Sequence, residues 1–196
     1  MENRASFFNR LRPVVPPDRL LDVELAYTMS KFAHRAQVRS ESDEYGKPLR
    51  YFEHPRRTAL LLMDEMGIMD VDLVIAALLH DGIEDTRDLT PEMIEHAWGH
   101  EVCRIVMLLS KRPKEGYEER LLSLGDWRVL AIKACDRLDN LRAMKPGQVS
   151  KEFRNRKRAE TREVYYPIFE KLLRLAPPQY SEGIARIVKE IHRRAD

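Results

Sequence analysis

The segment that most constrains the fold of this chain is an apolar helix that ends in a group of acids. Residues 71–79 (VDLVIAALL) are apolar except for Asp72, and residues 80–85 (HDGIED) contain one histidine and three acids. A helix that is apolar on every side is buried, so its polar end should face the interior or the floor of a cleft. Buried carboxylates are normally paired or bound to a metal, and this segment contains no basic residue. It therefore predicts a cation supplied from elsewhere.

Length and composition favour one domain without a dominant charge. The chain has 196 residues, enough for a substantial core, and its 34 basic and 32 acidic residues give a net charge of +2. This balance does not favour nucleic acid or a membrane, and no run approaches the ~18 apolar residues of a membrane span. Cys103 and Cys135 lie in apolar helical patterns and are interpreted as free buried thiols rather than a disulfide. Together with the lack of a signal-peptide pattern, they predict a cytoplasmic protein.

Helix signals follow one another along the rest of the chain. Capping residues and prolines mark most of the expected starts, and glycines mark several ends. The expected helices cover residues 20–38, 54–66, 71–85, a short segment after Thr90-Pro91, 99–111, 121–124, 127–144, 151–175 with an interruption near Pro167, and 181–194. No segment shows the alternation of a strand, and residues 39–48 have the composition of a loop.

These signals predict an all-α fold, a single bundle of about eight to ten helices. Residues 1–19 contain three prolines and are expected to form an arm on the surface. Residues 20–176 are expected to form the domain, and residues 177–196 a C-terminal helix that packs on the same domain through its apolar stripe.

Three groups of polar residues stand where chemistry is expected. His80 and Glu84 are spaced i, i+4, as are Asp81 and Asp85, so they lie on neighbouring patches of one helix end. The other two groups are His54, before a proline, and the pair Asp136 and Asn140 on a second buried helix. Imidazoles and carboxylates from separate elements suit a divalent transition metal such as manganese, iron or zinc. With no P-loop or nucleophile-elbow motif, the set points to metal-assisted hydrolysis.

Ordinary structural interpretations are preferred for other features. The remaining histidines are interpreted as core or surface residues without a metal: His34, His96, His100 and His192. The basic run from Arg154 to Arg162 is interpreted as a solvated helix face, because acids are interleaved with it and no aromatic ladder accompanies it.

Several segments together resemble a known family. The order His54, His80-Asp81 and Asp136 is similar to the metal signature of the HD-domain phosphohydrolases. More narrowly, the chain resembles the alarmone hydrolase domain of the RelA/SpoT homologues from about residue 31 to 170. The segments that carry this resemblance are AHxxQxR (33–39), YxxHP (51–55), AALLHDxxEDT (76–86), KxxDRLxNxR (133–142) and ETxEVYxP (160–167).

The resemblance implies a stand-alone small alarmone hydrolase, of the type that includes the metazoan SpoT homologue. Such an enzyme uses Mn²⁺ or another divalent metal to remove the 3′-pyrophosphate of ppGpp or pppGpp, giving GDP or GTP. The expected partner is thus a nucleotide, without nucleic acid or membrane, and a homo-oligomer is compatible with the family. The implied roles are metal binding for His54, His80, Asp81 and Asp136; catalysis for Glu84 and Asp85; and substrate binding for Arg39, Tyr51 and Asn140.

Departures from the family pattern leave alternatives for the substrate. Ser40 stands where the family commonly has a lysine, and the loop from Arg39 to Tyr51 is longer than usual. Asp139 stands where an aromatic residue or histidine is frequent, and Ala143 where a polar group can occur. A related hydrolase of another nucleotide, such as NADPH or a pyrophosphorylated adenosine, is therefore a second hypothesis. A non-catalytic nucleotide sensor is a third, disfavoured because both acids at positions 84 and 85 are present.

Overall fold

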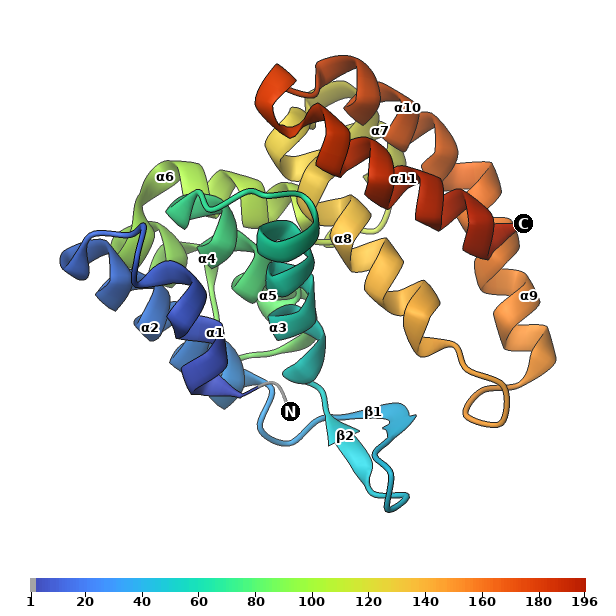
Figure 1. Cartoon of the computed structure of the whole chain (residues 1–196), viewed down its shortest axis with the longest axis horizontal. Helices are drawn as coiled ribbons and strands as arrows, with labels where there is room; N and C mark the ends of the chain where they lie inside the picture. Colours follow the sequence, from blue (N-terminus) through green and yellow to red (C-terminus); the bar gives the residue numbers. More distant parts are fainter. Residues whose placement is uncertain (1–2) are drawn as a thin grey trace.

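The computed structural model describes residues 3–196 and confirms an all-α architecture (Figure 1). In this part of the chain, sheet structure is limited to one two-stranded hairpin. The elements are α1 Arg4–Leu11, α2 Pro17–Ala33, β1 Val38–Ser42, β2 Pro48–Arg50, α3 Glu53–Leu60, α4 Val71–Leu79, α5 Gly82–Asp85, α6 Pro91–Leu109, α7 Tyr117–Leu124, α8 Trp127–Ala143, α9 Lys151–Glu160, α10 Tyr166–Leu175 and α11 Ser181–Ala195, with π-helical turns at Leu61–Glu65 (η1) and Thr161–Tyr165 (η2) and a 3-10 turn at Pro178–Tyr180 (η3).

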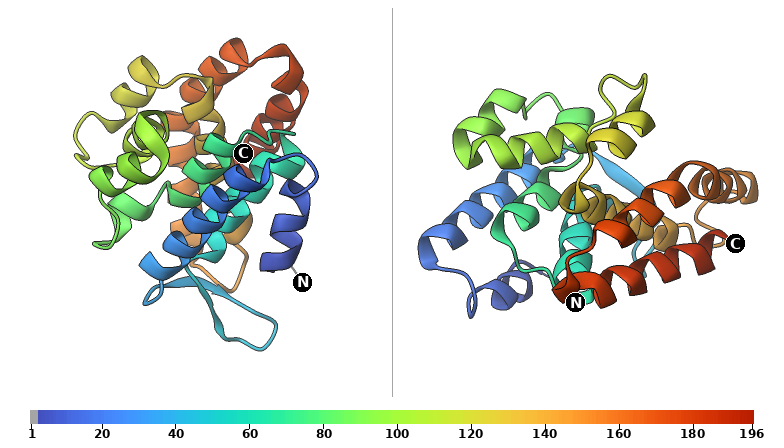
Figure 2. Two further views of the ribbon diagram at one scale, coloured as in Figure 1. Left: turned by 90° about the vertical axis from the view of Figure 1, so that its left-hand side faces the viewer. Right: turned by 90° about the horizontal axis from the view of Figure 1, so that it is seen from above.

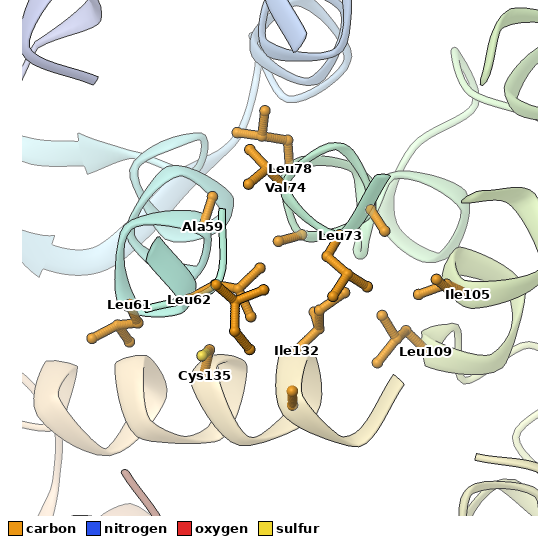
Figure 3. Close-up of a cluster of buried hydrophobic side chains, with 14 of the residues drawn as sticks. Ala59, Leu61, Leu62, Leu73, Val74, Leu78, Ile105, Leu109, Ile132 and Cys135 are labelled. Atoms are coloured by element: carbon orange, nitrogen blue, oxygen red, sulfur yellow. The ribbon is translucent and has the colours of Figure 1, made fainter. Parts of the chain in front are cut away.

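Helix α4 is the centre of the core, as its apolar sequence predicts. The side chain of Asp70 caps its N-terminus by accepting a hydrogen bond from the backbone N–H of Leu73, at 3.0 Å. Every residue from Leu73 to Leu79 is at most 1% exposed, because α2, α3, α6 and α8 surround the helix. Figure 3 shows part of this core, where Leu73 and Val74 lie beside side chains of α3, α6 and α8. Each buried leucine, isoleucine or valine contributes roughly 1.5–3 kcal/mol to stability.

Helix α8 joins the two sides of the molecule. Asp126 caps it by accepting hydrogen bonds from the backbone N–H groups of Arg128 and Val129, as expected from the sequence. The helix packs against α3 and α6 on one side and against α10 and α11 on the other (Figures 1 and 2). Since it is buried from both sides, its polar residues face either a partner or a cavity.

The prediction of a surface arm is wrong over Arg4–Leu11, because these residues form the helix α1. Phe7 and Phe8 are fully buried, and both rings contact the ring of Tyr27 on α2, with centroids 5.3 and 5.4 Å apart. Burial of this short helix depends on docking against α2, which the local sequence does not show. Residues 1–2 of the predicted arm lie outside the described residues.

The prediction of a loop over residues 39–48 is also wrong, because most of this segment belongs to an antiparallel hairpin. Strands β1 and β2 pair Val38 with Arg50 and Ser42 with Pro48, and the hairpin projects from the helices (Figure 2). Asp43 closes the turn, since its Oδ1 accepts hydrogen bonds from two backbone N–H groups of the turn. The preceding helix accordingly ends at Ala33 rather than near residue 38. Strands this short and polar carry little apolar alternation in the sequence.

The C-terminal region packs on α8. Helix α11 buries Ile184, Ile187 and Ile191 and contacts α8 and α10. A side chain at Gly183 would meet the backbone oxygen of Met66 at 2.5 Å, so only glycine permits this close approach. Both cysteines are free and buried, as predicted. Among the described residues, no helix combines the length and apolarity that crossing a bilayer requires.

Candidate active site

Three elements bring together the residues predicted to bind a metal. His54 lies in the first turn of α3, His80 and Asp81 lie between α4 and α5, and Asp136 lies on α8. His54, His80 and Asp81 each offer a ligand atom, and these atoms lie within 4.8 Å of one another. The Oδ1 atom of Asp136 is 3.1 Å from Nε2 of His54 and 3.9 Å from Nε2 of His80. One ion can therefore contact groups from residues 54, 80, 81 and 136.

The two imidazoles are oriented as metal ligands. His80 donates from Nδ1 to the backbone oxygen of Ala77 at 2.8 Å, while its Nε2 is buried and makes no hydrogen bond. His54 lies with Nδ1 2.6 Å from Oδ2 of Asp139, and a carboxylate accepts, so Nδ1 carries the proton. Nε2 of His54 lies 3.1 Å from Asp136 and 3.4 Å from Asp81, so the Nε2 atoms of both rings face the same gap. The buried Nε2 of His80, which makes no hydrogen bond, fits a divalent metal in this position.

The carboxylates of the group are held in their charged form. Burial would raise the pKa of Asp136, but Lys133 and His54 outweigh it and hold the pKa well below its usual range. Burial likewise opposes ionisation of Asp81, and His80 and His54 keep its pKa well below the usual value. The same acids act on His54: burial would lower its pKa, but Asp136 and Asp139 raise it well above the usual value. Ionised carboxylates beside two imidazoles form a mixed oxygen and nitrogen set that suits a divalent transition metal.

Helix α4 does not continue through the acidic segment. It ends at Leu79, and Gly82 begins the single turn α5. A side chain at Gly82 would lie 2.5 Å from Leu89, so the turn approaches the α5–α6 connection closely. Glu84 and Asp85 both lie in α5, and as consecutive residues of one helical turn they point in different directions.

The two predicted catalytic acids consequently have different surroundings. The hydroxyl of Tyr51 lies 2.7 Å from Oδ2 of Asp85 and 2.9 Å from Oδ2 of Asp81, so it bridges Asp85 to the metal-binding group. Burial and the charge of Asp81 raise the pKa of Asp85, which is typical of a group that accepts protons near neutral pH. Glu84 instead accepts a hydrogen bond from the backbone N–H of Lys111 at 3.0 Å.

The residues predicted to bind substrate are already part of a hydrogen-bond network. Arg39 donates to Oε2 of Glu41 at 3.0 Å and to Oδ1 of Asn140 at 3.1 Å. Asn140 donates to Oδ1 of Asp136 at 2.6 Å. Tyr51 stacks on the ring of His34, with centroids 4.7 Å apart. The histidine interpreted as an ordinary core residue thus supports the tyrosine that bridges two acids.

A cavity of about 400 Å³ opens beside this group, and both acids and cations line it. The cations are residues to which sequence analysis gave no role: Lys111, Lys133, Arg137 and Lys157. Lys133 donates to Oδ2 of Asp136 at 2.8 Å, and its position three residues before that acid was the available signal. Apolar side chains complete the wall at Met144, Val149 and Phe153.

Sequence analysis also missed the residues behind His54. Asp139, which is buried, forms an ion pair there with the partly exposed Arg57, and Glu41 of β1 contacts the same arginine. The spacing of Asp136 and Asp139, i and i+3 on one helix, was the signal that placed both toward α3.

Comparisons with known proteins give this arrangement a family context. Residues 30–120 match the family model described as HD domain. The guanosine-3′,5′-bis(diphosphate) 3′-pyrophosphohydrolase of Aquifex aeolicus is 36% identical over 166 residues, which are 80% of this chain and 22% of that protein. The bifunctional (p)ppGpp synthase/hydrolase SpoT of Escherichia coli is 31% identical over 174 residues, 83% of this chain and 23% of that protein. The chain thus matches less than a quarter of the length of these relatives.

A solved structure has the same fold over most of the chain. It is described as a metazoan ortholog of SpoT that hydrolyses ppGpp, and it is 25% identical to this chain with a TM-score of 0.66. The similarity covers 86% of this chain and 94% of that one.

Proposed function

Because this chain is an HD-domain protein related in sequence to the ppGpp hydrolases, we propose that it removes the 3′-pyrophosphate of ppGpp and pppGpp and releases GDP or GTP. One observation carries the proposal: a metal-binding group and several cations line a single cavity. A polyphosphate needs both, a divalent cation at the reacting phosphorus and positive side chains along the remaining phosphates.

The metal would be held by His54, His80, Asp81 and Asp136, and Mn²⁺ is the ion we propose. Two imidazoles and two carboxylates form a mixed nitrogen and oxygen set that suits a first-row transition metal. When bound, such an ion lowers the pKa of its water and offsets negative charge on the phosphate. The chain's part is to bring four ligand groups together, with the Nε2 atoms of both histidines directed toward the two carboxylates.

Asp85 is the residue we assign to proton acceptance from the attacking water. Its raised pKa and its link to Asp81 through Tyr51 support this role. Glu84 lines the same cavity and accepts a hydrogen bond from the backbone of Lys111. We assign it to orienting the water relative to the phosphate.

The cations that line the cavity are assigned to the phosphates. Lys111 lines it beside Glu84, and Lys157 and Arg137 line it beside Glu160. The apolar wall at Met144, Val149 and Phe153 supplies a surface for the nucleoside. Within this proposal, Asn140 and Arg39 contact the nucleoside from the hairpin side.

A second candidate is hydrolysis of another phosphorylated nucleotide, such as NADPH or a pyrophosphorylated adenosine. The observation that favours it is the state of Arg39, whose guanidinium is engaged by Glu41 and Asn140. An arginine held by a neighbouring carboxylate is less available to select a guanine base. The free cysteines support a reducing compartment for either activity, and we propose the cytoplasm.

One assay tests both candidates. Purified protein is incubated with ppGpp, pppGpp, NADPH and pyrophosphorylated adenosine nucleotides, with Mn²⁺ or with EDTA, and released pyrophosphate and phosphate are measured. We expect release of pyrophosphate from ppGpp with Mn²⁺ and no release with EDTA. Turnover of NADPH without turnover of ppGpp would support the second candidate, and no turnover of any nucleotide would refute both.

A further inference from the structure

The buried carboxylate of Asp139 lies on the far side of His54 from the cavity. Helix α3 presents His54 and Arg57 toward α8, and α8 presents Asp136 and Asp139 toward α3, each pair spaced i and i+3. Asp136 meets Nε2 of His54 at 3.1 Å, whereas Asp139 meets Nδ1 at 2.6 Å. The two acids of α8 therefore hold opposite edges of one imidazole.

Arg57 fixes the orientation of Asp139. Its Nε donates to Oδ1 of Asp139 at 2.6 Å, and its Nη2 lies 3.1 Å from Oδ2. Glu41 accepts a hydrogen bond from Nη2 of Arg57 at 2.9 Å, from the hairpin side. The side chains of Asp139 and His54 are 5% and 1% exposed, so water does not compete for these bonds. Both oxygens of Asp139 are thus committed, and the atom facing His54 is an acceptor.

We propose that Asp139 is a positioning residue that locks His54 in the Nδ1–H tautomer, and that the chain Glu41–Arg57–Asp139 thereby sets the metal affinity of the site. The proposal rests on the metal site of the proposed function, but not on the identity of the nucleotide. A carboxylate behind a metal-bound histidine fixes the ring and increases the basicity of the ligating nitrogen. The acidic residue at position 139 and the long hairpin that carries Glu41 would then act together to orient His54.

The alternative is that Asp139 only neutralises the guanidinium of Arg57. Both roles predict that loss of the carboxylate destabilises the fold. They differ for the metal. In Asp139→Asn, one side-chain amide must face donors from both Arg57 and His54, and its NH₂ group opposes one of them. Moving the proton of His54 to Nε2 relieves this conflict but occupies the lone pair that the metal needs.

The experiment is a titration of metal-free protein with Mn²⁺, followed by the electron paramagnetic resonance signal of the free ion. Asp139→Asn should bind Mn²⁺ about 10–100-fold more weakly than wild type. The matched control is Glu190→Gln. Arg142 lies on the same helix as Asp139, and this variant removes one of its carboxylate partners, so Mn²⁺ affinity should be unchanged. Equal affinity in Asp139→Asn and wild type would overturn the proposal.

A double variant, Arg57→Met with Asp139→Asn, separates the two roles and provides a test if the single variant does not fold. It contains no unpaired guanidinium, so stability should recover relative to Asp139→Asn, while Mn²⁺ affinity should remain weak. Recovery of wild-type affinity in the double variant would show that Asp139 acts only on Arg57 and would refute the proposal. Wild-type protein that binds Mn²⁺ without hydrolysing ppGpp would refute the proposed substrate and leave this inference intact.

Discussion

Lys133 offers the sharpest test of how charge is balanced at the metal site. Its Nζ donates to Oδ2 of Asp136 at 2.8 Å, and its side chain is 4% exposed between the rings of Tyr117 and Tyr165. Burial would lower the pKa of Lys133, but Asp136 keeps that pKa well above its usual value. The ammonium is therefore a permanent positive charge beside a proposed metal ligand.

Replacing Lys133 with Met removes this charge and keeps much of the side chain's volume. Removing one partner of a buried ion pair typically costs about 3–5 kcal/mol of unfolding free energy. Asp136 retains His54 and Asn140 as neighbours, at 3.1 and 2.6 Å, so we expect the lower end of this range. For a chain of this size, ~3 kcal/mol corresponds to a fall in Tm of roughly 6–12 °C in the metal-free protein.

Mn²⁺ should restore part of this loss, because the ion becomes the main charge that compensates Asp136. We expect the metal-induced rise in Tm to be larger in Lys133→Met than in wild type. A tenfold gain in metal affinity adds about 1.4 kcal/mol at saturating Mn²⁺. Turnover should fall, since the cavity loses one of its cations.

The assay is thermal unfolding of each variant with EDTA and with saturating Mn²⁺. Lys111→Met is the matched control, because that side chain is 41% exposed and its ammonium lies 3.5 Å from Glu84 rather than beside a proposed ligand. It should change the unfolding free energy by less than about 1 kcal/mol in either condition. A metal-induced shift in Lys133→Met no larger than in wild type would refute the proposed balance of charge around Asp136.

Three further predictions concern the acids and their partners. Asp81→Ala should lose both bound metal and turnover, whereas Glu84→Ala should keep the metal and lose turnover; elemental analysis showing metal loss in Glu84→Ala would contradict this division. Tyr51→Phe should retain Mn²⁺ and lower kcat roughly 10–100-fold, because the hydroxyl that links the two aspartates is removed; an unchanged kcat would refute that link. The hydrogen bond from Arg142 lowers the pKa of Glu190 from 4.5 to about 2, so its contribution to stability is present above about pH 4.5 and is lost as the pH falls toward 2. Urea unfolding at about pH 5 and pH 3 measures this loss. After discounting for solvent screening, we expect the free energy of unfolding to fall by about 1 kcal/mol more in wild type than in Glu190→Gln. Equal falls in the two proteins would contradict this.

Local patterns in the sequence predict much of the helical framework. Capping needs only residues a few positions apart, so the starts of α4 and α8 follow from Asp70 and Asp126 without knowledge of the fold. The buried position of α4 follows from its composition alone. His80, Asp81 and Asp136 stand out for the same reason, because they follow or interrupt an apolar helix, whereas His54 is marked only by the proline after it.

Local patterns fail where structure depends on docking or on few residues. Helix α1 has a polar sequence with two phenylalanines, and only contact with α2 explains their complete burial. The hairpin pairs two short polar strands whose residues have weak strand preference. Arg39 and Glu41 connect it to the helices through hydrogen bonds with Asn140 and Arg57.

The partners of the site residues are decided by tertiary structure alone. Asp139 is 85 residues from His54 in sequence, and their contact exists because α3 and α8 cross with matching i, i+3 faces. The partners of the two neighbouring acids in α5 likewise come from distant segments, Tyr51 for Asp85 and Lys111 for Glu84. A sequence specifies which side chains can bind a metal or move a proton, because these are properties of single residues. Tautomer, ionisation and orientation depend on distances between elements, and the packing of helices sets those distances.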